Sequence, residues 1–229
     1  MNAQGIHLIS TDEKPGIQAL ERKYPTKPMK PGLVERVEFE YIRHGTQCLT
    51  ANFDVATGQI ISPTLALTRR EEDFAAHIAR TIALDPNGQW IFIMDNLNTH
   101  RSESVVRLIN EVCGLKAELG VKEKFGILES MESRSRFLSD PEHRVRFIYT
   151  PKHASWLNQV EIWFSILVRR CLKRASFCSL EEQAERIELF IQFFNTTLSK
   201  PFKWKYKGPK LEEQTKILYF PERVKRKAS

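Results

Sequence analysis

The stretch WIFIMDNLNTH, residues 90–100, restricts the fold more than any other part of the sequence. Four apolar residues in a row, 90–93, predict a short buried strand, and polar side chains follow from Asp95 onward. A carboxylate directly after a buried strand is typical of the ligand-binding edge of an α/β sheet. On its own the stretch favours an ordinary turn that caps the next helix. Two further carboxylates in similar settings shift the balance toward a functional site.

Length and composition favour one folded domain with a polyanionic partner. The 229 residues, 41% of them hydrophobic, are enough for a domain with a sizeable core, with or without an appendage. The net charge of +7 and the isoelectric point near 9.3 favour a polyanion such as nucleic acid. Many basic proteins bind no nucleic acid, so the charge supports other observations and does not replace them.

The sequence predicts a cytoplasmic protein without a membrane segment. The first ten residues carry neither a charged leader nor an apolar signal-peptide core, and no apolar run reaches the length of a membrane span. The cysteines lie far apart and form no C-x-x-C pair, which predicts reduced thiols rather than a zinc site or a disulfide framework. They are Cys48, Cys113, Cys171 and Cys178.

Periodicity predicts an α/β fold in the order strand, hairpin, strand, helix, strand, helix, strand, helix. The first strand is predicted to end at Asp12, before a loop broken by four prolines, and the hairpin to turn at His44-Gly45. Residues 120–143 are charged and poorly periodic, which indicates an exposed loop or insertion with at most one short helix. The predicted strands are 6–12, two runs within 34–55, 59–67, 90–93 and 145–149, and the predicted helices are 71–84, 102–119, 155–174 and one that begins with Ser179 as N-cap.

Three carboxylates in this order are candidates for a metal site. Asp12 ends the first predicted strand and Asp95 follows the predicted strand 90–93, so a sheet in which these strands are neighbours brings the two side by side. Glu161 lies within the apolar stripe of a later helix, where a carboxylate is costly unless it is paired or binds metal. A buried salt bridge accounts for Glu161 as well as a functional role does.

Three carboxylates that converge require a cation to stay charged. Mg²⁺ or Mn²⁺ is the expected ion, because both prefer carboxylate and water oxygens. Two such ions, about 3.5–4 Å apart, would activate a water and stabilise the leaving oxygen of a phosphodiester. The basic charge and the acidic triad together predict a protein that binds DNA and cuts it.

The end of the chain interleaves aromatic residues with lysines. PFKWKYKGP (201–209) and the basic RVKRKAS (223–229) would suit contact with a nucleic-acid backbone. A packed C-terminal arm with a solvated basic end suits the same residues equally well.

Several segments together resemble one known family. They are STDEKPGIQALER (10–22), RHGT (43–46), MDNLNTH (94–100), TPKHASWLNQVEIWF (150–164) and PFKW (201–204). In this order they are similar to segments of the D-D-E transposases of bacterial insertion sequences, in the mariner superfamily. The resemblance covers nearly the whole chain. It implies a ribonuclease-H-like mixed five-stranded sheet flanked by helices, two catalytic Mg²⁺ or Mn²⁺ ions, and DNA strand cleavage and transfer at transposon ends.

The resemblance also implies roles for individual residues. Asp12, Asp95 and Glu161 would be the catalytic residues and the metal ligands. His100 and Trp156 lie in matched motifs as supporting residues, with a local hydrogen bond at a helix start as the alternative for His100 and simple packing as the alternative for Trp156. The third supporting candidate is Asn158, and the candidate DNA-binding residues are Arg43, His44, Lys152, Arg169, Arg170 and Lys173.

Two features depart from the family pattern. Between Asp95 and Glu161 lie 65 residues (96–160), whereas the motif implied by the resemblance has about 34, so we expect an insertion within 115–143. The chain starts almost at the first catalytic strand, so we expect no N-terminal helix-turn-helix domain. The predicted organisation is a catalytic domain over 1–200 and a basic C-terminal arm over 201–229. The chain would then be a catalytic fragment, a split-frame product or a remnant.

The implied partners are DNA, as transposon ends and target, a second copy of the chain in the active complex, and a separate helix-turn-helix protein that binds the ends. The implied location is the bacterial cytoplasm, at the nucleoid. A DNA-binding or assembly protein that keeps the fold without catalysis is the main alternative, and the presence of all three acids argues against it. A nuclease that cuts RNA–DNA hybrids is another, and the mariner-type motifs count against it.

Overall fold

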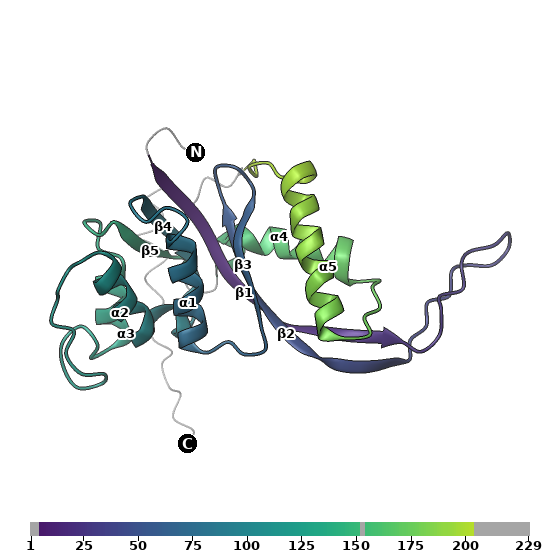
Figure 1. Cartoon of the computed structure of the whole chain (residues 1–229), viewed down its shortest axis with the longest axis horizontal. Helices are drawn as coiled ribbons and strands as arrows, with labels where there is room; N and C mark the ends of the chain where they lie inside the picture. The colour runs from purple at the N-terminus through teal and green to yellow at the C-terminus, as the bar shows by residue number, and fades with distance from the viewer. Residues whose placement is uncertain (1–4, 152–153, 204–229) are drawn as a thin grey trace, which may run out of the picture.

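The computed structural model describes residues 5–151 and 154–203 and is built on a five-stranded mixed sheet (Figure 1). The strand order is β3-β2-β1-β4-β5. The central strand β1 is antiparallel to β2 and parallel to β4, which is parallel to β5. The predicted neighbourhood of the strand that carries Asp12 and the strand that precedes Asp95 is thereby confirmed. The strands are β1 Ile6–Arg22, β2 Tyr41–Asp54, β3 Ile60–Ala66, β4 Gln89–Met94 and β5 Val145–Tyr149.

Helices gather at two ends of the sheet, with α1, α2 and α3 over β4 and β5 and with α4 and α5 near β2 (Figure 1). Side-chain caps fix where α2 and α5 begin, because Ser102 accepts the Val105 N–H and Ser179 accepts the Glu182 N–H. None of the described helices is long and apolar enough to cross a membrane. The helices are α1 Glu71–Ile82, α2 Glu103–Val112, α3 Met131–Leu138, α4 Val160–Leu167 and α5 Leu180–Phe193. The described residues also contain two short 3₁₀ turns, η1 Asn98–Arg101 and η2 Ser155–Leu157, and two π-helical turns, η3 Val168–Leu172 and η4 Phe194–Leu198.

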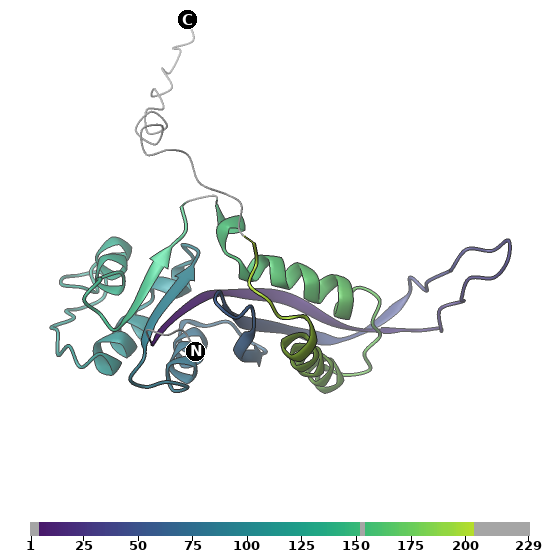
Figure 2. The ribbon, with the colours of Figure 1, turned by 90° about the horizontal axis from the view of Figure 1, so that it is seen from above.

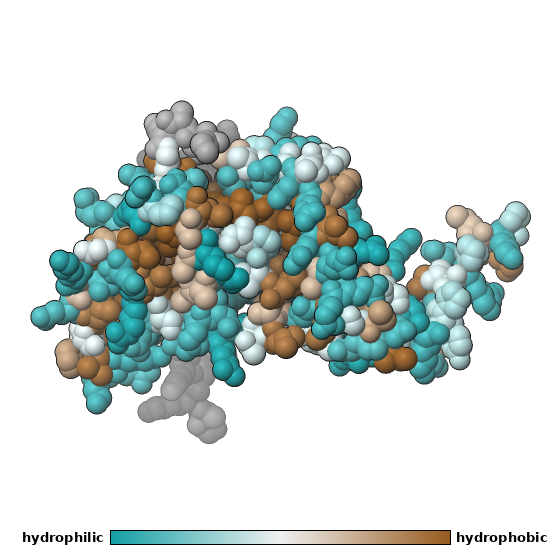
Figure 3. Space-filling view, in the orientation of Figure 1, coloured by the Kyte–Doolittle hydropathy of each residue, from teal (hydrophilic) through white to brown (hydrophobic). Residues whose placement is uncertain are grey.

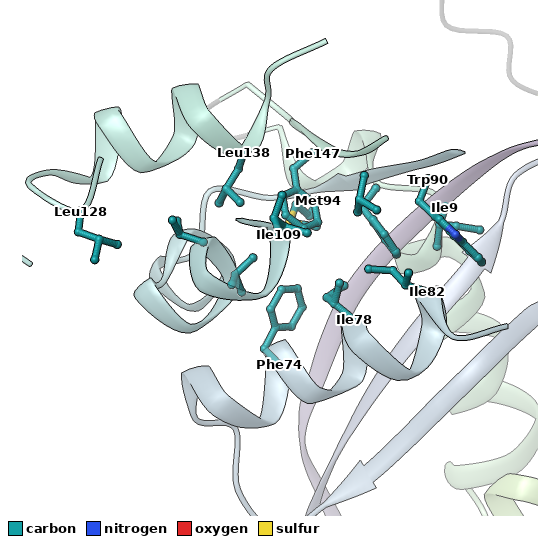
Figure 4. Close-up of a cluster of buried hydrophobic side chains, with 14 residues drawn as sticks. Ile9, Phe74, Ile78, Ile82, Trp90, Met94, Ile109, Leu128, Leu138 and Phe147 are labelled. Atoms are coloured by element: carbon teal, nitrogen blue, oxygen red, sulfur yellow. The ribbon is translucent and has the colours of Figure 1, made fainter. Parts of the chain in front are cut away.

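The first hydrophobic core lies between β4, β5 and the helices α1 to α3. Phe74, Ile78 and Ile82 recur every fourth residue on α1 and are all buried, as the predicted amphipathic helix requires. Figure 4 shows them directed at Trp90 and Met94 of β4. This packing fixes the carboxyl end of β4, and Asp95 is the next residue along the chain.

The second core joins α4 and α5 to the strands β1, β2 and β3. Leu49, Ala51 and Phe53 alternate along β2 and are fully buried, in agreement with the predicted strand face. The buried residues of the two helices complete this core. They are Val160, Trp163, Phe164, Leu167, Ile187 and Ile191. The second core therefore anchors α4, the helix that carries Glu161, to the strand that carries Asp12.

The first strand is longer than predicted. β1 runs on to Arg22, so Asp12 lies in the middle of the strand and not at its end. Pro15 is accommodated because the pairing of β1 with β2 is irregular between Lys14 and Ile17, where no ladder hydrogen bond is needed. The other prolines of the expected loop lie beyond Arg22.

The predicted hairpin turn at His44-Gly45 is wrong. β2 is continuous through both residues, and Gly45, at φ 135°, lies beside a second irregularity in the β1–β2 ladder. The turn lies instead at 23–40, between β1 and β2, and Val37 and Phe39 in it are exposed rather than on a strand face. β1 and β2 thus form a long two-stranded ribbon whose tip projects from the body (Figure 2).

Three other segments differ from their predictions. The helix expected over 102–119 ends at Val112, before Gly114 and Lys116 with positive φ. Residues 120–143 contain the short helix α3, which the prediction allowed, but Leu128 and Leu138 are fully buried in the first core, so this segment is not simply an exposed loop. The helix expected over 155–174 is divided into η2, α4 and η3. Lys152 and residues 204–229, which include most of the predicted basic arm, lie outside the described residues.

Replacement of His77 by glutamine is expected to make the protein less sensitive to acid. His77 on α1 is fully buried, and burial together with the charge of Arg80 lowers its pKa from 6.5 to about 3. Between these values the unfolded chain binds a proton that the folded chain excludes, so the free energy of unfolding falls as the pH falls below 6.5. Between pH 7 and pH 5 this costs the wild type about 2 kcal/mol, a loss that His77→Gln lacks. Urea unfolding of both proteins at both pH values measures the difference, and equal losses would contradict it.

Candidate active site

The parallel pairing of β1 and β4 brings Asp12 and Asp95 to the same edge of the sheet. Ser10 is the register partner of Ile93, and each aspartate lies two residues further along its strand direction. β4 ends at Met94, so Asp12 lies where the neighbouring strand has just ended. The structure therefore brings together the two aspartates that the sequence singles out.

Asp12 is a buried carboxylate with two hydrogen bonds. It is 6% exposed, Oδ1 accepts the Glu13 N–H at 2.8 Å, and Oδ2 accepts the Asn158 Nδ2–H at 3.2 Å. Burial raises the pKa of Asp12 to about 7, and the charges of Asp95 and Glu161 act in the same direction. The Glu13 N–H and the charge of His100 oppose this rise without cancelling it. A cation at this carboxylate would relieve both unfavourable effects.

Asp95 is partly exposed and is held through one of its oxygens. Its Oδ1 lies 2.9 Å from His100 Nδ1 and accepts the Leu97 N–H at 2.9 Å, while the side chain as a whole is 32% exposed. The hydrogen bond from His100 lowers the pKa of Asp95, so this carboxylate stays ionised at neutral pH.

His100, in η1, is completely buried between two carboxylates. Its Nδ1 contacts Asp95, its Nε2 lies 3.5 Å from Glu13 Oε2, and its ring packs on Phe74 at a centroid distance of 4.4 Å. Burial alone would disfavour the imidazolium, but the hydrogen bond with Asp95 and the nearby carboxylate of Glu13 raise the pKa of His100 to about 9. The local contact expected at a helix start is present, and the long-range contact with Glu13 accompanies it.

Glu161 lies in the first turn of α4 and is exposed, so its predicted place in the buried stripe is wrong. The buried face of α4 is formed by Val160, Trp163, Phe164 and Leu167, because the helix starts only after Asn158. The Glu161 carboxylate consequently faces solvent, and its charge still reaches Asp12, whose pKa it raises. This position suits a ligand that must accept a substrate from outside.

Ser10 and Asn158 tie the start of α4 to β1. The Ser10 hydroxyl donates to Asn158 Oδ1 and accepts the Val160 N–H at 2.8 Å, and Asn158 Nδ2 also donates to the Thr11 carbonyl at 2.8 Å. Both side chains are buried. This network connects the Asp12 segment directly to the turn that carries Glu161.

Glu13 and Ser10 belong to the site although neither was among the predicted residues. One ligand atom each from Asp12, Glu13 and His100 lie within 4.8 Å of one another, a grouping that could hold a metal ion. The sequence does contain a signal for them. Residues 10–13 are four consecutive polar residues in a central strand, where apolar side chains are the norm.

The remaining candidates lie around this centre or away from it. Arg43 and His44 are exposed on the ribbon, and His44 forms a 2.7 Å ion-pair contact with Glu21. Trp156 is 53% exposed in the turn before α4. Arg169, Arg170 and Lys173 are exposed in or just after η3.

Comparison with known proteins gives a family and a fold. A sequence model of the family described as DDE superfamily endonuclease matches residues 7–183. The solved structure "Mos1 transposase paired-end complex with left transposon end" is similar at a TM-score of 0.51 and 13% identity, over 81% of this chain and 47% of that chain. "Crystal structure of the Mos1 Strand Transfer Complex" matches at a TM-score of 0.33 and 16% identity, over 86% of this chain and 56% of that chain. The chain thus spans about half the length of these structures. No curated protein sequence matches it significantly.

Replacement of Ser10 by alanine is expected to destabilise the fold by about 1–3 kcal/mol, because it leaves the buried Val160 N–H and Asn158 Oδ1 without their partner. The control variant Ser165→Ala on α4 removes an exposed hydroxyl and is expected to change the stability by less than about 0.5 kcal/mol. Chemical unfolding of the two variants measures both values. A loss for Ser10→Ala no larger than that for Ser165→Ala would contradict the structural role of this network.

Proposed function

The chain belongs to the DDE superfamily endonucleases, and on that premise we propose that it cleaves DNA strands at the ends of an insertion sequence and transfers them to target DNA. One observation carries the proposal. Asp12 and Asp95 share one edge of the sheet, and Glu161 lies near enough to raise the pKa of Asp12. In this proposal the three carboxylates are the catalytic residues, as expected from the sequence.

The proposed cofactor is a pair of Mg²⁺ or Mn²⁺ ions held by Asp12, Asp95 and Glu161. The donor set suits such ions, because all three side chains offer hard carboxylate oxygens. Asp12 also supplies a specific reason for a cation, since burial and two neighbouring carboxylates disfavour its ionised form. When bound, the ions would activate the attacking oxygen and stabilise the leaving oxygen of the phosphodiester.

The residues around the triad would hold and orient the DNA. A groove of about 290 Å³ between β1 and η3 is lined by Lys14, Arg22 and Lys173, together with apolar side chains such as Ile17. Arg169 and Arg170 add positive charge on the exposed side of η3. Such a basic groove beside the acidic centre suits a phosphate backbone. Trp156 and Asn158 are proposed as supporting residues at the turn before Glu161.

We further propose that the active form is a homodimer that works with a separate end-binding protein of the helix-turn-helix type. Support for the dimer comes from the tip of the β1–β2 ribbon, where Met29, Val34 and Phe39 are 77%, 78% and 81% exposed. Figure 3 shows hydrophobic side chains among hydrophilic ones on this projecting tip. Exposed apolar patches of this kind mark interaction surfaces.

Wild-type protein is expected to nick supercoiled plasmid DNA that carries the element's ends in the presence of Mn²⁺, and Asp95→Asn to nick it at least about 100-fold more slowly. Asparagine keeps the shape of the side chain and removes the charge that a metal ion needs. Glu132→Gln on α3, an exposed carboxylate remote in sequence from the triad, is the matched control and should nick like the wild type. Equal nicking by Asp95→Asn would contradict the site. Absence of nicking by the wild type together with retained DNA binding would favour the inactive DNA-binding protein.

The double variant Val34→Glu/Phe39→Glu is expected to shift the protein from dimer to monomer, because it places charges on the proposed contact surface. Light scattering after size-exclusion chromatography gives the mass directly. Leu84→Glu, at a 61% exposed leucine outside the ribbon, serves as the control and should stay dimeric. An unchanged mass of the double variant would exclude the ribbon tip as the dimer contact.

A further inference from the structure

We propose that Glu13 and His100 are positioning residues that together hold the carboxylate of Asp95 in place for the metal site, an inference that rests on the proposed function. His100 contacts Asp95 through Nδ1 at 2.9 Å and Glu13 through Nε2 at 3.5 Å. The imidazole thus links a carboxylate of β1 to the carboxylate that follows β4.

The link is rigid because the imidazole of His100 and the carboxylate of Glu13 are both enclosed. The side chain of His100 is 0% exposed and that of Glu13 is 4% exposed. Phe74 of α1 packs on the imidazole ring, and Tyr149 donates its hydroxyl hydrogen to the His100 carbonyl at 3.2 Å. A side chain fixed at this many points has little freedom to turn, so it also fixes the oxygen to which it donates.

A contribution to stability alone does not account for this charged contact. Apolar side chains of similar volume often stabilise a core as well as a buried ion pair does, so a retained pair calls for another explanation. His77 provides a comparison within the same helix layer. It is equally buried, but it contacts the neutral hydroxyl of Thr64 at 2.8 Å instead of a carboxylate.

A positioning role fits the geometry better than direct metal ligation by His100. A cation between His100 and Glu13 would lie among side chains that are closed to solvent and hence to a phosphodiester. Asp95 is the exposed member of the chain of contacts, at 32%. Its recorded side-chain hydrogen bonds among the described residues use Oδ1, which leaves Oδ2 for a cation. Partners behind a ligand commonly set its orientation in this way.

The experiment measures Mn²⁺ affinity of the whole chain by electron paramagnetic resonance of the free ion, without DNA and independently of activity. Two variants remove the link, His100→Gln, whose amide nitrogen lies near the former Nε2, and Glu13→Leu. Two conservative variants keep part of it, His100→Asn, with a donor near the former Nδ1, and Glu13→Gln, with an acceptor oxygen. His77→Gln controls for the loss of a buried imidazole. Circular dichroism melts establish that each variant is folded.

The disruptive variants are expected to bind Mn²⁺ about 10–100-fold more weakly than the wild type, and each conservative variant to lie between its disruptive counterpart and the wild type. His77→Gln should stay within about twofold. Pulsed electron paramagnetic resonance of Mn²⁺ on the wild type should show no ¹⁴N coupling, because the imidazole is not a ligand. A merely structural role would lower the melting temperature without this ranking of affinities.

Two results would overturn the inference. One is Mn²⁺ affinity of both disruptive variants within about twofold of His77→Gln, and the other is a ¹⁴N coupling that identifies His100 as a direct ligand. In either case Asp12→Asn and Asp95→Asn would still abolish Mn²⁺ binding if the proposed function holds. Two other results would contradict the proposed function itself, and the inference with it. In one the wild type binds no Mn²⁺, and in the other Asp12→Asn binds Mn²⁺ as well as the wild type does.

Discussion

The parallel pairing of β1 with β4 is the interaction on which the rest of the site depends. It aligns Ser10 with Ile93, and the two aspartates come together because each lies two residues beyond this pair in the same direction. The pairing itself is held by the first core, in which Ile9, Trp90 and Phe92 are buried with the apolar face of α1. A shift of one residue in this register would turn one aspartate to the other face of the sheet.

Charge is the second constraint, since the register gathers acids in a place with little water. Asp12 and Glu13 are neighbours on one strand and alternate to different surroundings, Asp12 toward Asn158 before α4 and Glu13 toward His100 in η1. The imidazolium of His100 compensates Glu13 and Asp95, whereas Asp12 is left with a hydrogen-bonded but unfavourable charge. The arrangement therefore distinguishes Glu13, which lies beside a positive charge inside the protein, from Asp12, whose charge is not compensated in this way.

The sequence is sufficient for the family and for the neighbourhood of the two strands that carry Asp12 and lead to Asp95. The expected resemblance to D-D-E transposases agrees with the family match, and the ribonuclease-H-like sheet agrees with the fold of the solved transposase structure. Local sequence patterns mispredict the ends of strands and helices where contacts between distant segments determine them. Pro15 suggested the end of a strand, yet an irregular ladder admits it. The break at Asn158 sets where α4 starts, and it depends on hydrogen bonds with Ser10 of a distant strand. The local pattern does not contain this break and therefore places Glu161 in the buried stripe. The contact between Glu13 and His100 likewise joins segments that no local period connects.

The insertion expected between Asp95 and Glu161 bears on the same centre. They contain α3, which packs against α2, β5 and the turn η1 that carries His100. Leu128 and Leu138 bury this segment in the first core, the core that also holds Phe74 behind the His100 ring. A long connection between the two proposed catalytic carboxylates could be expected to loosen the site. Here the segment that contains α3 instead packs against η1 and supports the turn through which Asp95 is held, so its length is compatible with a fixed distance between the carboxylates.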